Sequence, residues 1–458
     1  MEYIKIDKDI CAGCHECADI CPVGAISGEK GMCHTIDESK CIHCGQCVQK
    51  CKSYLSPDRE GVEKYFDKLK ERNLPDSVRE PLFAAYNVCH INEVKEALAN
   101  TTKICVVHCA PAVRVAIAEE FGEKAGCEDS GRLAASLYAL GFDHVYDANF
   151  AADLTIMEEG TELISRVTKN TGKLPMFTSC CPGWVSFVEN NYPEMKDHLS
   201  TCKSPQQMQG AIEKTYGAEI LHTDSACIYS VSIMPCTAKQ FEASRDEMWD
   251  SGHRDVDVVL TTRELAYLIK DQNIDYLNLE PRKFESDLGQ YTGAATIFVV
   301  TGGVMEAAIR TGYELITGKE IPALDITDVR GSEGFRTAQI KVNDDLTLKV
   351  GIVTGLANVY DVMEKVKNNE LDLHFIEVMA CPQGCISGGG QPKLLEDIYK
   401  DETYNMRRAG LYEHDADLPL RKSHENPSIK KIYDDFLGNP NSEKAHNLLH
   451  TTYCNQGR

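Results

Sequence analysis

The stretch that decides the fold is MACPQGCISGGGQP, Met379 to Pro392. It overlaps the end of an apolar run, His374 to Met379, which predicts a buried strand. Cys381 and Cys385 come just past that strand. The glycines after them have no side chain to obstruct a close approach between the backbone and a ligand. A strand that ends in two thiols and a glycine run is typical of a cradle for an iron cofactor.

Two distant stretches repeat this pattern of an apolar run followed by cysteine. They are PMFTSCCPGW, which ends at Trp184, and YSVSIMPCTAK, which ends at Lys239. Together the three stretches offer four soft ligands from three strand ends, which is enough to hold one iron–sulfur cluster. The four are Cys181, Cys236, Cys381 and Cys385.

The N-terminal region contains two further cysteine runs, CAGCHECADICP at residues 11–22 and CIHCGQCVQKC at residues 41–51. Both have the CxxCxxCxxxC spacing of two-cluster ferredoxins, in which the fourth cysteine of each run ligates the other cluster. Two zinc sites are the alternative, although zinc ribbons use paired CxxC motifs rather than runs of four. The spacing predicts two 4Fe-4S centres, one held by Cys11, Cys14, Cys17 and Cys51, the other by Cys41, Cys44, Cys47 and Cys21.

The composition excludes several other classes of protein. The chain has 458 residues and 21 cysteines, too many for an ordinary cytosolic enzyme and too few for a disulfide scaffold of this length. A net charge of -22 argues against nucleic acid, because a phosphate-binding surface needs clustered Lys and Arg. No export signal and no apolar run of about 18 residues is visible. The sequence therefore predicts a cytoplasmic protein that does not span a membrane.

The order of expected elements divides the chain into four parts. Residues 1–55 are ferredoxin-like, residues 56–82 form a charged helical connector, residues 83–393 form the main domain, and residues 394–458 are helical. The main domain alternates short apolar strands with helices, which predicts two α/β lobes with parallel or mixed sheets flanked by helices. Where the lobes meet, the cysteine-bearing strand ends would come together. The N-terminal part is expected to be a small α+β domain.

Individual elements follow from the same pattern. We expect strands at Ile104 to Val107 and at Thr296 to Val300, because both are short apolar runs. A helix is expected to begin at Pro111, since proline is tolerated in a first helical turn.

Three blocks of the sequence, TSCCPGW, MPCTAKQFE and EVMACPQGCISGGGQP, resemble in order and spacing the signature loops of FeFe-hydrogenases. The resemblance extends from about residue 80 to the C-terminus. It implies reversible H2 formation at an H-cluster, in which a 4Fe-4S cube is linked to a diiron unit with CO, cyanide and an azadithiolate bridge. Cys181, Cys236, Cys381 and Cys385 would hold the cube, and Cys385 would also bridge to the diiron unit. The C-terminal helices would wrap around the catalytic domain.

The resemblance also assigns roles to residues around the cofactor. Lys239 would donate to a cyanide ligand, and an ordinary surface lysine is the alternative. Met234 and Met379 would pack against the diiron unit, although methionines at such positions are more often core residues. Gln206 and Pro111 are further candidates for the wall of the site.

A proton route is the remaining part of the expected site. The resemblance implies that Cys180 exchanges protons with the bridging amine. Glu159, Glu162 and Arg166 lie on one face of an expected helix, and with Ser200 they match the relay of the family. The alternative is a solvated acidic face with an ordinary ion pair.

Two segments depart from the pattern of the family, at three residues in all. The third block has Gln383 where a glycine is common, and FVVTGG replaces FGATGG, so that Val299 and Val300 add bulk where the diiron unit is expected. Neither change removes a ligand, but both put the turnover rate, directional bias and oxygen sensitivity in doubt.

The resemblance implies ferredoxin or flavodoxin as the electron partner, maturation proteins that insert the diiron unit, and a monomer. A slow H2 sensor and an iron–sulfur assembly scaffold are the competing functions. The presence of Cys180, Lys239 and both methionines argues against the scaffold.

Overall fold

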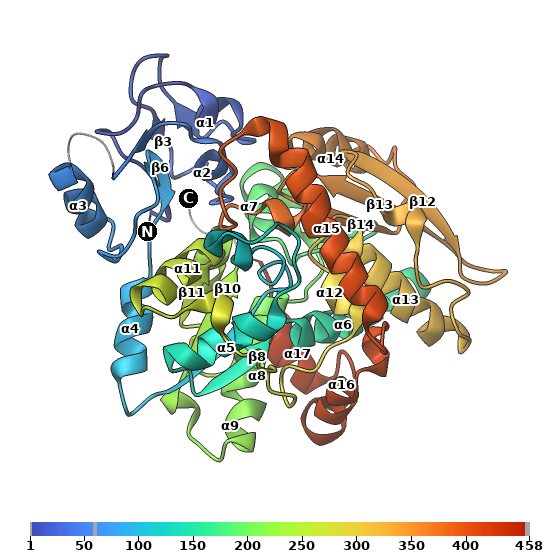
Figure 1. The fold of residues 1–458 in the computed structure, drawn as a ribbon. Coiled ribbons are helices and arrows are strands. Elements are labelled where there is room, and N and C mark those ends of the chain that lie inside the picture. Colours follow the sequence, from blue (N-terminus) through green and yellow to red (C-terminus); the bar gives the residue numbers. More distant parts are fainter. Residues whose placement is uncertain (1, 58–61, 454–458) are drawn as a thin grey trace.

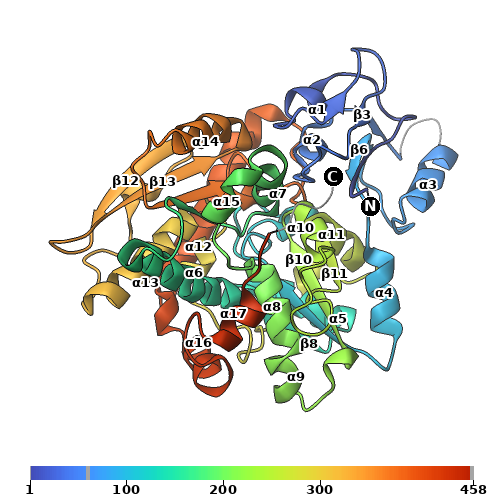
Figure 2. The same cartoon turned by 180° about the vertical axis from the view of Figure 1, so that it is seen from behind.

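The computed structural model describes residues 2–57 and 62–453. A small N-terminal domain, blue in Figure 1, lies against one corner of a large body of sheets and helices. Figure 2 shows the same arrangement from behind.

Short strand pairs and short helices build the N-terminal domain. β1 (Ile4–Ile6) pairs with β6 (Ala85–Asn87), and β4 (Tyr54–Leu55) pairs with β5 (Leu82–Phe83). Residues that follow the connector therefore complete the sheets of this domain. Its other elements and the connector helix are α1 (Glu16–Asp19), β2 (Ile26–Ser27), β3 (Thr35–Ile36), α2 (Gln46–Lys50) and α3 (Val62–Glu71).

The first lobe of the main domain is a parallel sheet with the strand order β11-β10-β7-β8. Both of its faces are covered, and for this reason its strands are apolar along nearly their whole length. The strands are β7 (Ile104–Cys109), β8 (His144–Asp147), β10 (Ile228–Met234) and β11 (Val258–Thr261).

The second lobe is a mixed sheet with the order β12-β13-β14-β9, in which only β12 is antiparallel to its neighbour. Its strands are β9 (Met176–Phe177), β12 (Phe335–Lys341), β13 (Thr347–Thr354) and β14 (Phe375–Met379). The cysteine loops follow β9, β10 and β14, so they lie at the carboxyl ends of parallel strands from both lobes. The predicted α/β class is confirmed.

Helices cover both sheets. Figure 2 shows α6, α8 and α17 together on one side, and Figure 1 shows α15 crossing the opposite side over α12. No helix among the described residues has the length and apolar character needed to cross a membrane. The helices of the main domain are α4 (Ile91–Ala99), α5 (Ser130–Leu140), α6 (Asn149–Lys169), α7 (Pro182–Asn191), α8 (Pro205–Lys214), α9 (Tyr216–Ile220), α10 (Ala238–Ala243), α11 (Thr262–Asp271), α12 (Gly293–Ile297), α13 (Gly303–Thr317) and α14 (Val359–Lys367). The C-terminal helices are α15 (Lys400–Asp417), α16 (Pro427–Ile432) and α17 (Glu443–Leu449).

Two expected elements of the main domain were wrong. The expected strand at Thr296 to Val300 is instead the end of α12 and the turn after it, because a short buried apolar run does not distinguish a strand from a helix. The expected helix at Pro111 is a series of turns that leads into a short 3-10 helix. An α-helix does not form here because two backbone carbonyls are bonded outside the segment. The Arg114 carbonyl accepts a hydrogen bond from Asp129 N at 3.0 Å, and the Val115 carbonyl accepts one from Gly126 N at 3.0 Å.

Candidate active site

Three loops from the two lobes enclose a cavity of about 80 Å³. The loop after β9 contributes Cys181, the loop after β10 contributes Cys236, and the loop after β14 contributes Cys381 and Cys385. The structure thus brings together the four cysteines that sequence spacing singled out. The other expected residues on the wall are Cys180, Met234, Met379, Lys239, Gln206 and Pro111.

The electrostatics of these thiols fit a cationic metal centre. Burial, and then the neighbouring Cys181, raises the pKa of Cys236 to about 12. Burial, followed by Cys236, raises the pKa of Cys381 well above its usual range. Such thiols ionise when positive metal compensates the charge, and a bound metal deprotonates a coordinating thiol. A set of four converging thiols suits an iron–sulfur cluster.

Glycines allow the loops to approach one another closely. A Cβ atom on Gly388 would lie 2.1 Å from the Pro235 carbonyl oxygen, and the same oxygen accepts a hydrogen bond from Gly390 N at 2.8 Å. Gly384 has a φ of 75°, in the left-handed region that favours glycine. The glycine run therefore allows the cysteine loop that follows β14 to lie directly against the cysteine loop that follows β10.

A buried ion pair fixes Lys239 at the cavity. Its Nζ donates to the Cys180 carbonyl at 3.0 Å and to both carboxylate oxygens of Glu242 at 3.0 and 2.9 Å. Gln206 Nε2 donates to Glu242 at 3.0 Å, and Ser204 Oγ donates to the same oxygen at 2.7 Å. Gln206 is therefore linked to Lys239 through the carboxylate. The arrangement places an ammonium group at the cavity wall, where an anionic ligand of a cofactor could accept a hydrogen bond from it.

The three residues that depart from the family pattern, Val299, Val300 and Gln383, lie in different surroundings. Val299 lines the cavity, and its carbonyl accepts a hydrogen bond from Cys385 N at 2.9 Å. Val300 is fully buried in an adjacent apolar cluster rather than on the cavity wall. Gln383 points to the C-terminal segment, where Arg408 donates to its side-chain oxygen. Of the three, Val299 is the one whose side chain borders the cofactor space.

The expected relay residues form a chain from the cavity towards the surface. Ser200 Oγ donates to Glu162 Oε2 at 2.9 Å, and Arg166 Nη2 donates to Glu162 Oε1 at 2.6 Å. Between them and Cys180 lies Glu159, which is 2% exposed. The structure brings these five residues together, as expected from the face of the helix and the resemblance.

Glu159 has the properties of a proton carrier. Burial, and then the charge of Glu162, raise its pKa from 4.5 to about 8. Neither carboxylate oxygen has a hydrogen-bond partner of good geometry in the described residues, although the Ser200 hydroxyl and the Ser179 amide lie near enough to lower the pKa. At neutral pH this carboxyl group is mostly protonated, so it has a proton to give.

The N-terminal cysteines gather in the crossed sets that their spacing predicts. Burial, then Cys51, Cys11 and Cys14, raises the pKa of Cys17 to about 12. In the second set, burial and then Cys44, Cys41 and Cys21 raise the pKa of Cys47 well above its usual range. Each thiol therefore lies within electrostatic range of its expected co-ligands.

The second of these sets lies against the cavity. Gln46 Nε2 donates to the Cys381 thiol at 3.2 Å. A Cβ atom on Gly389 would lie 2.6 Å from the Cys44 carbonyl oxygen and 2.7 Å from Gly45 Cα. Two glycines, one from each domain, thus allow backbone contact between the two ligand loops. The order from outside to inside is the Cys17 set, the Cys47 set and the cavity.

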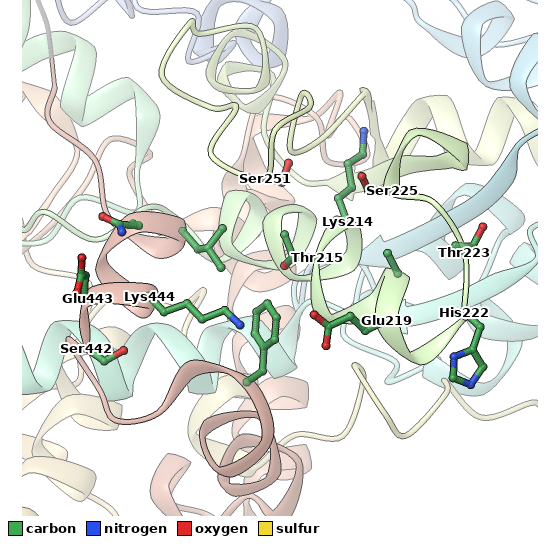
Figure 3. Close-up of a pocket in the computed structure, with 14 residues that line it drawn as sticks. Lys214, Thr215, Glu219, His222, Thr223, Ser225, Ser251, Ser442, Glu443 and Lys444 are labelled. Atoms are coloured by element: carbon green, nitrogen blue, oxygen red, sulfur yellow. The ribbon is translucent and has the colours of Figure 1, made fainter.

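A larger, open hollow of about 1110 Å³ lies elsewhere, between α8, α9 and α17 (Figure 3). Its side chains are mainly polar and include Lys214, Glu219, His222 and Lys444. None of the converging cysteines borders it. The chemistry therefore belongs to the smaller, enclosed cavity.

Comparison with known proteins agrees with this geometry. Residues 103–389 match the iron only hydrogenase large subunit, C-terminal domain; residues 401–456 match the iron hydrogenase small subunit; residues 3–53 match a 4Fe-4S dicluster domain. The chain belongs to the FeFe-hydrogenases.

Curated relatives and solved structures of hydrogenases are similar along most of the chain. The NADP-reducing hydrogenase subunit HndD of Solidesulfovibrio fructosivorans is 47% identical over 441 residues, covering 92% of this chain and 74% of that protein. The periplasmic Fe hydrogenase large subunit of Nitratidesulfovibrio vulgaris is 44% identical over 417 residues, covering 90% of this chain and 91% of that protein. A variant of the apo FeFe-hydrogenase HydA1 from Chlamydomonas reinhardtii has a TM-score of 0.70 at 41% identity, covering 80% of this chain and 98% of the other.

As an FeFe-hydrogenase, the protein carries an H-cluster and additional 4Fe-4S clusters. Two residues of this hydrogenase that contact the site, Glu242 and Gln46, were not predicted from the sequence. Glu242, which anchors Lys239, lies one helical turn after it within the quoted block MPCTAKQFE, and that i, i+3 spacing is a usable signal. Gln46, which contacts Cys381, lies between two cluster cysteines, and nothing in its own run points to a distant loop.

Proposed function

We propose that this FeFe-hydrogenase catalyses the reversible reaction of two protons and two electrons to H2, with ferredoxin or flavodoxin as its electron partner. The observation that carries the proposal is the meeting of three features at one cavity: four converging thiols, an adjoining cysteine set, and a chain of proton-carrying side chains. The H-cluster, when bound, supplies the diiron centre at which H2 is formed or split.

Twelve cysteines are proposed to hold the clusters. The H-cluster cube would be held by Cys181, Cys236, Cys381 and Cys385, with Cys385 shared with the diiron unit. The 4Fe-4S clusters would be held by Cys11, Cys14, Cys17 and Cys51 and by Cys41, Cys44, Cys47 and Cys21. Cys14 is exposed, which supports the Cys17 set as the point where electrons enter.

The wall of the cavity is proposed to orient the diiron unit. Lys239, held by Glu242, would donate to an anionic ligand of the unit. Met234, Met379 and Pro111 would exclude water from it, since all three border the cavity. This apolar enclosure strengthens the electrostatic interactions within the site.

Protons are proposed to move between the Cys180 thiol and the surface along Glu159, Ser200 and Glu162. The raised pKa of Glu159 supports this role, because a group that is protonated at neutral pH can both donate and accept. Arg166 would hold the Glu162 carboxylate in place without losing its own proton, since a guanidinium stays charged in proteins.

The test of the proposed function is Cys180→Ala in the fully loaded enzyme. Because the thiol is the proposed proton carrier next to the cofactor, the variant should lose at least about 100-fold in H2 turnover. Its iron content and its infrared bands from CO and cyanide should stay unchanged. Cys109→Ala is the control for loss of a thiol, since Cys109 is a buried cysteine that does not border the cavity. Full activity in Cys180→Ala would refute the proton route.

The electron partner needs a separate test, because HndD is named as a subunit of an NADP-reducing hydrogenase. Membership of such an assembly is the second candidate for this chain. Reduced ferredoxin, reduced flavodoxin and NADPH should be compared as sole donors for H2 evolution. Turnover with ferredoxin or flavodoxin and none with NADPH is expected. Activity from NADPH that appears only with an added subunit would favour the second candidate.

The proposal extends to the organisation of the protein. Its parts would be a ferredoxin-like domain (1–55), a connector (56–82), an H-cluster domain (83–393) and a small-subunit-like segment (394–458). The protein would act as a cytoplasmic monomer that receives its diiron unit from maturation proteins. A relative named as periplasmic makes cell fractionation the direct check of location.

A further inference from the structure

A second group of metal-ligating side chains lies outside the cavity. Glu162 on α6, Cys202 just before α8 and His450 just after α17 point their ligand atoms toward one another, all within 4.8 Å. Cys202 Sγ lies 3.9 Å from Glu162 Oε2 and 3.8 Å from His450 Nδ1. We propose that these three side chains form a binding site for a divalent ion of the zinc class, and that occupation of this site blocks the proton route.

Backbone pairing fixes the positions of two of the ligands. Cys202 and His450 form an antiparallel bridge. Lys203 N donates to the Leu449 carbonyl at 2.8 Å, and Thr451 N donates to the Thr201 carbonyl at 2.7 Å. The thiol and the imidazole are therefore held opposite each other before any ion arrives, which lowers the ordering cost of binding.

The surroundings of His450 are those of a metal-binding histidine. Its Nε2 lies 3.0 Å from Glu158 Oε2. That carboxylate is in turn held by the Tyr433 hydroxyl and by Asn441 N at 2.7 Å. A ligating histidine usually donates its second ring N–H to a carboxylate, which fixes the ring and leaves the other nitrogen to the metal. Here that nitrogen is Nδ1, the atom nearest to Cys202.

The donor set selects the kind of ion. One thiolate, one imidazole and one carboxylate suit Zn²⁺, whereas Mg²⁺ and Ca²⁺ take oxygen ligands. A tetrahedral zinc site with ordinary bond lengths has ligand atoms about 3.5 Å apart, so the two distances from Cys202 need to shorten by only a few tenths of an ångström. Thr201 Oγ1, now 2.8 Å from His450 Nδ1 and 3.2 Å from Glu162 Oε2, would give up both hydrogen bonds.

The charges around the site also favour a cation. The titratable groups that face the thiol are Glu158, Glu159, Glu162, Tyr433, His450 and Tyr453, while Arg166 and His446 lie next to Glu162 and His450. Burial, and then the charge of Glu162, raise the pKa of Cys202 well above its usual range. The negative charges of Glu158 and Glu162 close to the thiol attract a cation.

Occupation of this site would take Glu162 out of the relay. This consequence rests on the proposed proton route, whereas binding itself does not. A carboxylate bonded to zinc can no longer exchange a proton with Ser200, because the metal engages its charge and the oxygen that now accepts the hydrogen bond from Ser200. Zinc should therefore slow H2 evolution without changing the reduction of the clusters.

The experiment uses the fully loaded enzyme with one equivalent of Zn²⁺. X-ray absorption at the zinc edge should show one sulfur at about 2.3 Å together with nitrogen or oxygen ligands. Equilibrium dialysis should give binding that weakens more than about tenfold in Cys202→Ala. Cys105→Ala is the matched control, because Cys105 is a buried thiol of β7 outside the group. Zinc should inhibit H2 evolution by the wild type and the control, and a chelator should restore it.

Three outcomes are decisive. A zinc spectrum without sulfur, or equal binding by Cys202→Ala and Cys105→Ala, would overturn the site. If Cys202→Ala does not fold, the wild-type spectrum still decides whether sulfur is a ligand. Zinc bound through sulfur with H2 evolution unchanged would overturn the inhibition and the role of Glu162, while the loss of activity in Cys180→Ala would separately uphold the proposed reaction.

Discussion

Replacing Glu159 with glutamine removes the carboxyl group that the proposed relay needs while keeping the size of the side chain. At about 1.36 kcal/mol for each pKa unit, the rise from 4.5 to about 8 means that ionising Glu159 costs about 5 kcal/mol more in the folded protein than in water. The carboxyl is thus mostly protonated at pH 7. Glutamine neither gives up nor accepts a proton in this way, so we expect Glu159→Gln to lower H2 turnover by about 100-fold or more.

Infrared spectroscopy tests this reasoning independently of turnover. The difference between wild type and Glu159→Gln should contain the band of a protonated carboxyl, and that band should disappear with a midpoint near pH 8. Because the charge of Glu162 is the second cause of the raised pKa, Glu162→Gln should move the midpoint to lower pH. The free energy of unfolding should also depend on pH. Between pH 4.5 and about 8 the folded state holds this proton and the unfolded state does not, so the stability of the wild type falls as pH rises through this range. A Glu159 carboxyl that is ionised at pH 6 would refute the reasoning.

Three further predictions concern residues that hold the site together. Glu242→Gln removes the ion pair of Lys239, so the loaded variant should show shifted or weaker cyanide bands in its infrared spectrum; an unchanged spectrum would contradict the anchoring role. Gln46→Leu removes a donor to Cys381, and a loss of about 1 kcal/mol in the stabilisation of the reduced cube should lower its potential by roughly 40 mV in a redox titration. Gly389→Ala places a Cβ against the loop of the N-terminal domain that contains Cys44. H2 turnover with ferredoxin should therefore fall more than H2 turnover with methyl viologen. Equal losses of turnover with the two donors would count against the domain contact.

The convergence of the four cysteines at the cavity could be predicted from sequence, because their place after apolar runs reflects local structure. Cys381 and Cys385 follow a strand that the alternation of elements already indicated, and the crossed sets of the N-terminal domain follow from the spacing of each run. Local patterns could not distinguish α12 from a strand, since a buried apolar run lacks the polar face that reveals the period.

Contacts between residues far apart in the chain could not be predicted from the sequence. Gln46 meets Cys381 across 335 positions of the chain, and His450 meets Cys202 across 248. Neither pair has a spacing that marks it, because such contacts depend on how the domains and the C-terminal segment pack. The bulk of Val299 and Val300 looked equivalent in sequence, yet only Val299 borders the cavity.

The enclosed cavity is expected to hold an H-cluster and to make H2 there. One anaerobic experiment tests this: the purified chain is loaded with a synthetic diiron precursor, its infrared spectrum is recorded, and H2 evolution from reduced methyl viologen is followed. We expect metal-bound CO and cyanide bands together with rapid H2 evolution. Bands with very slow turnover would instead point to a sensor, and the absence of bands would refute the diiron site, leaving the four cysteines to hold a cube alone.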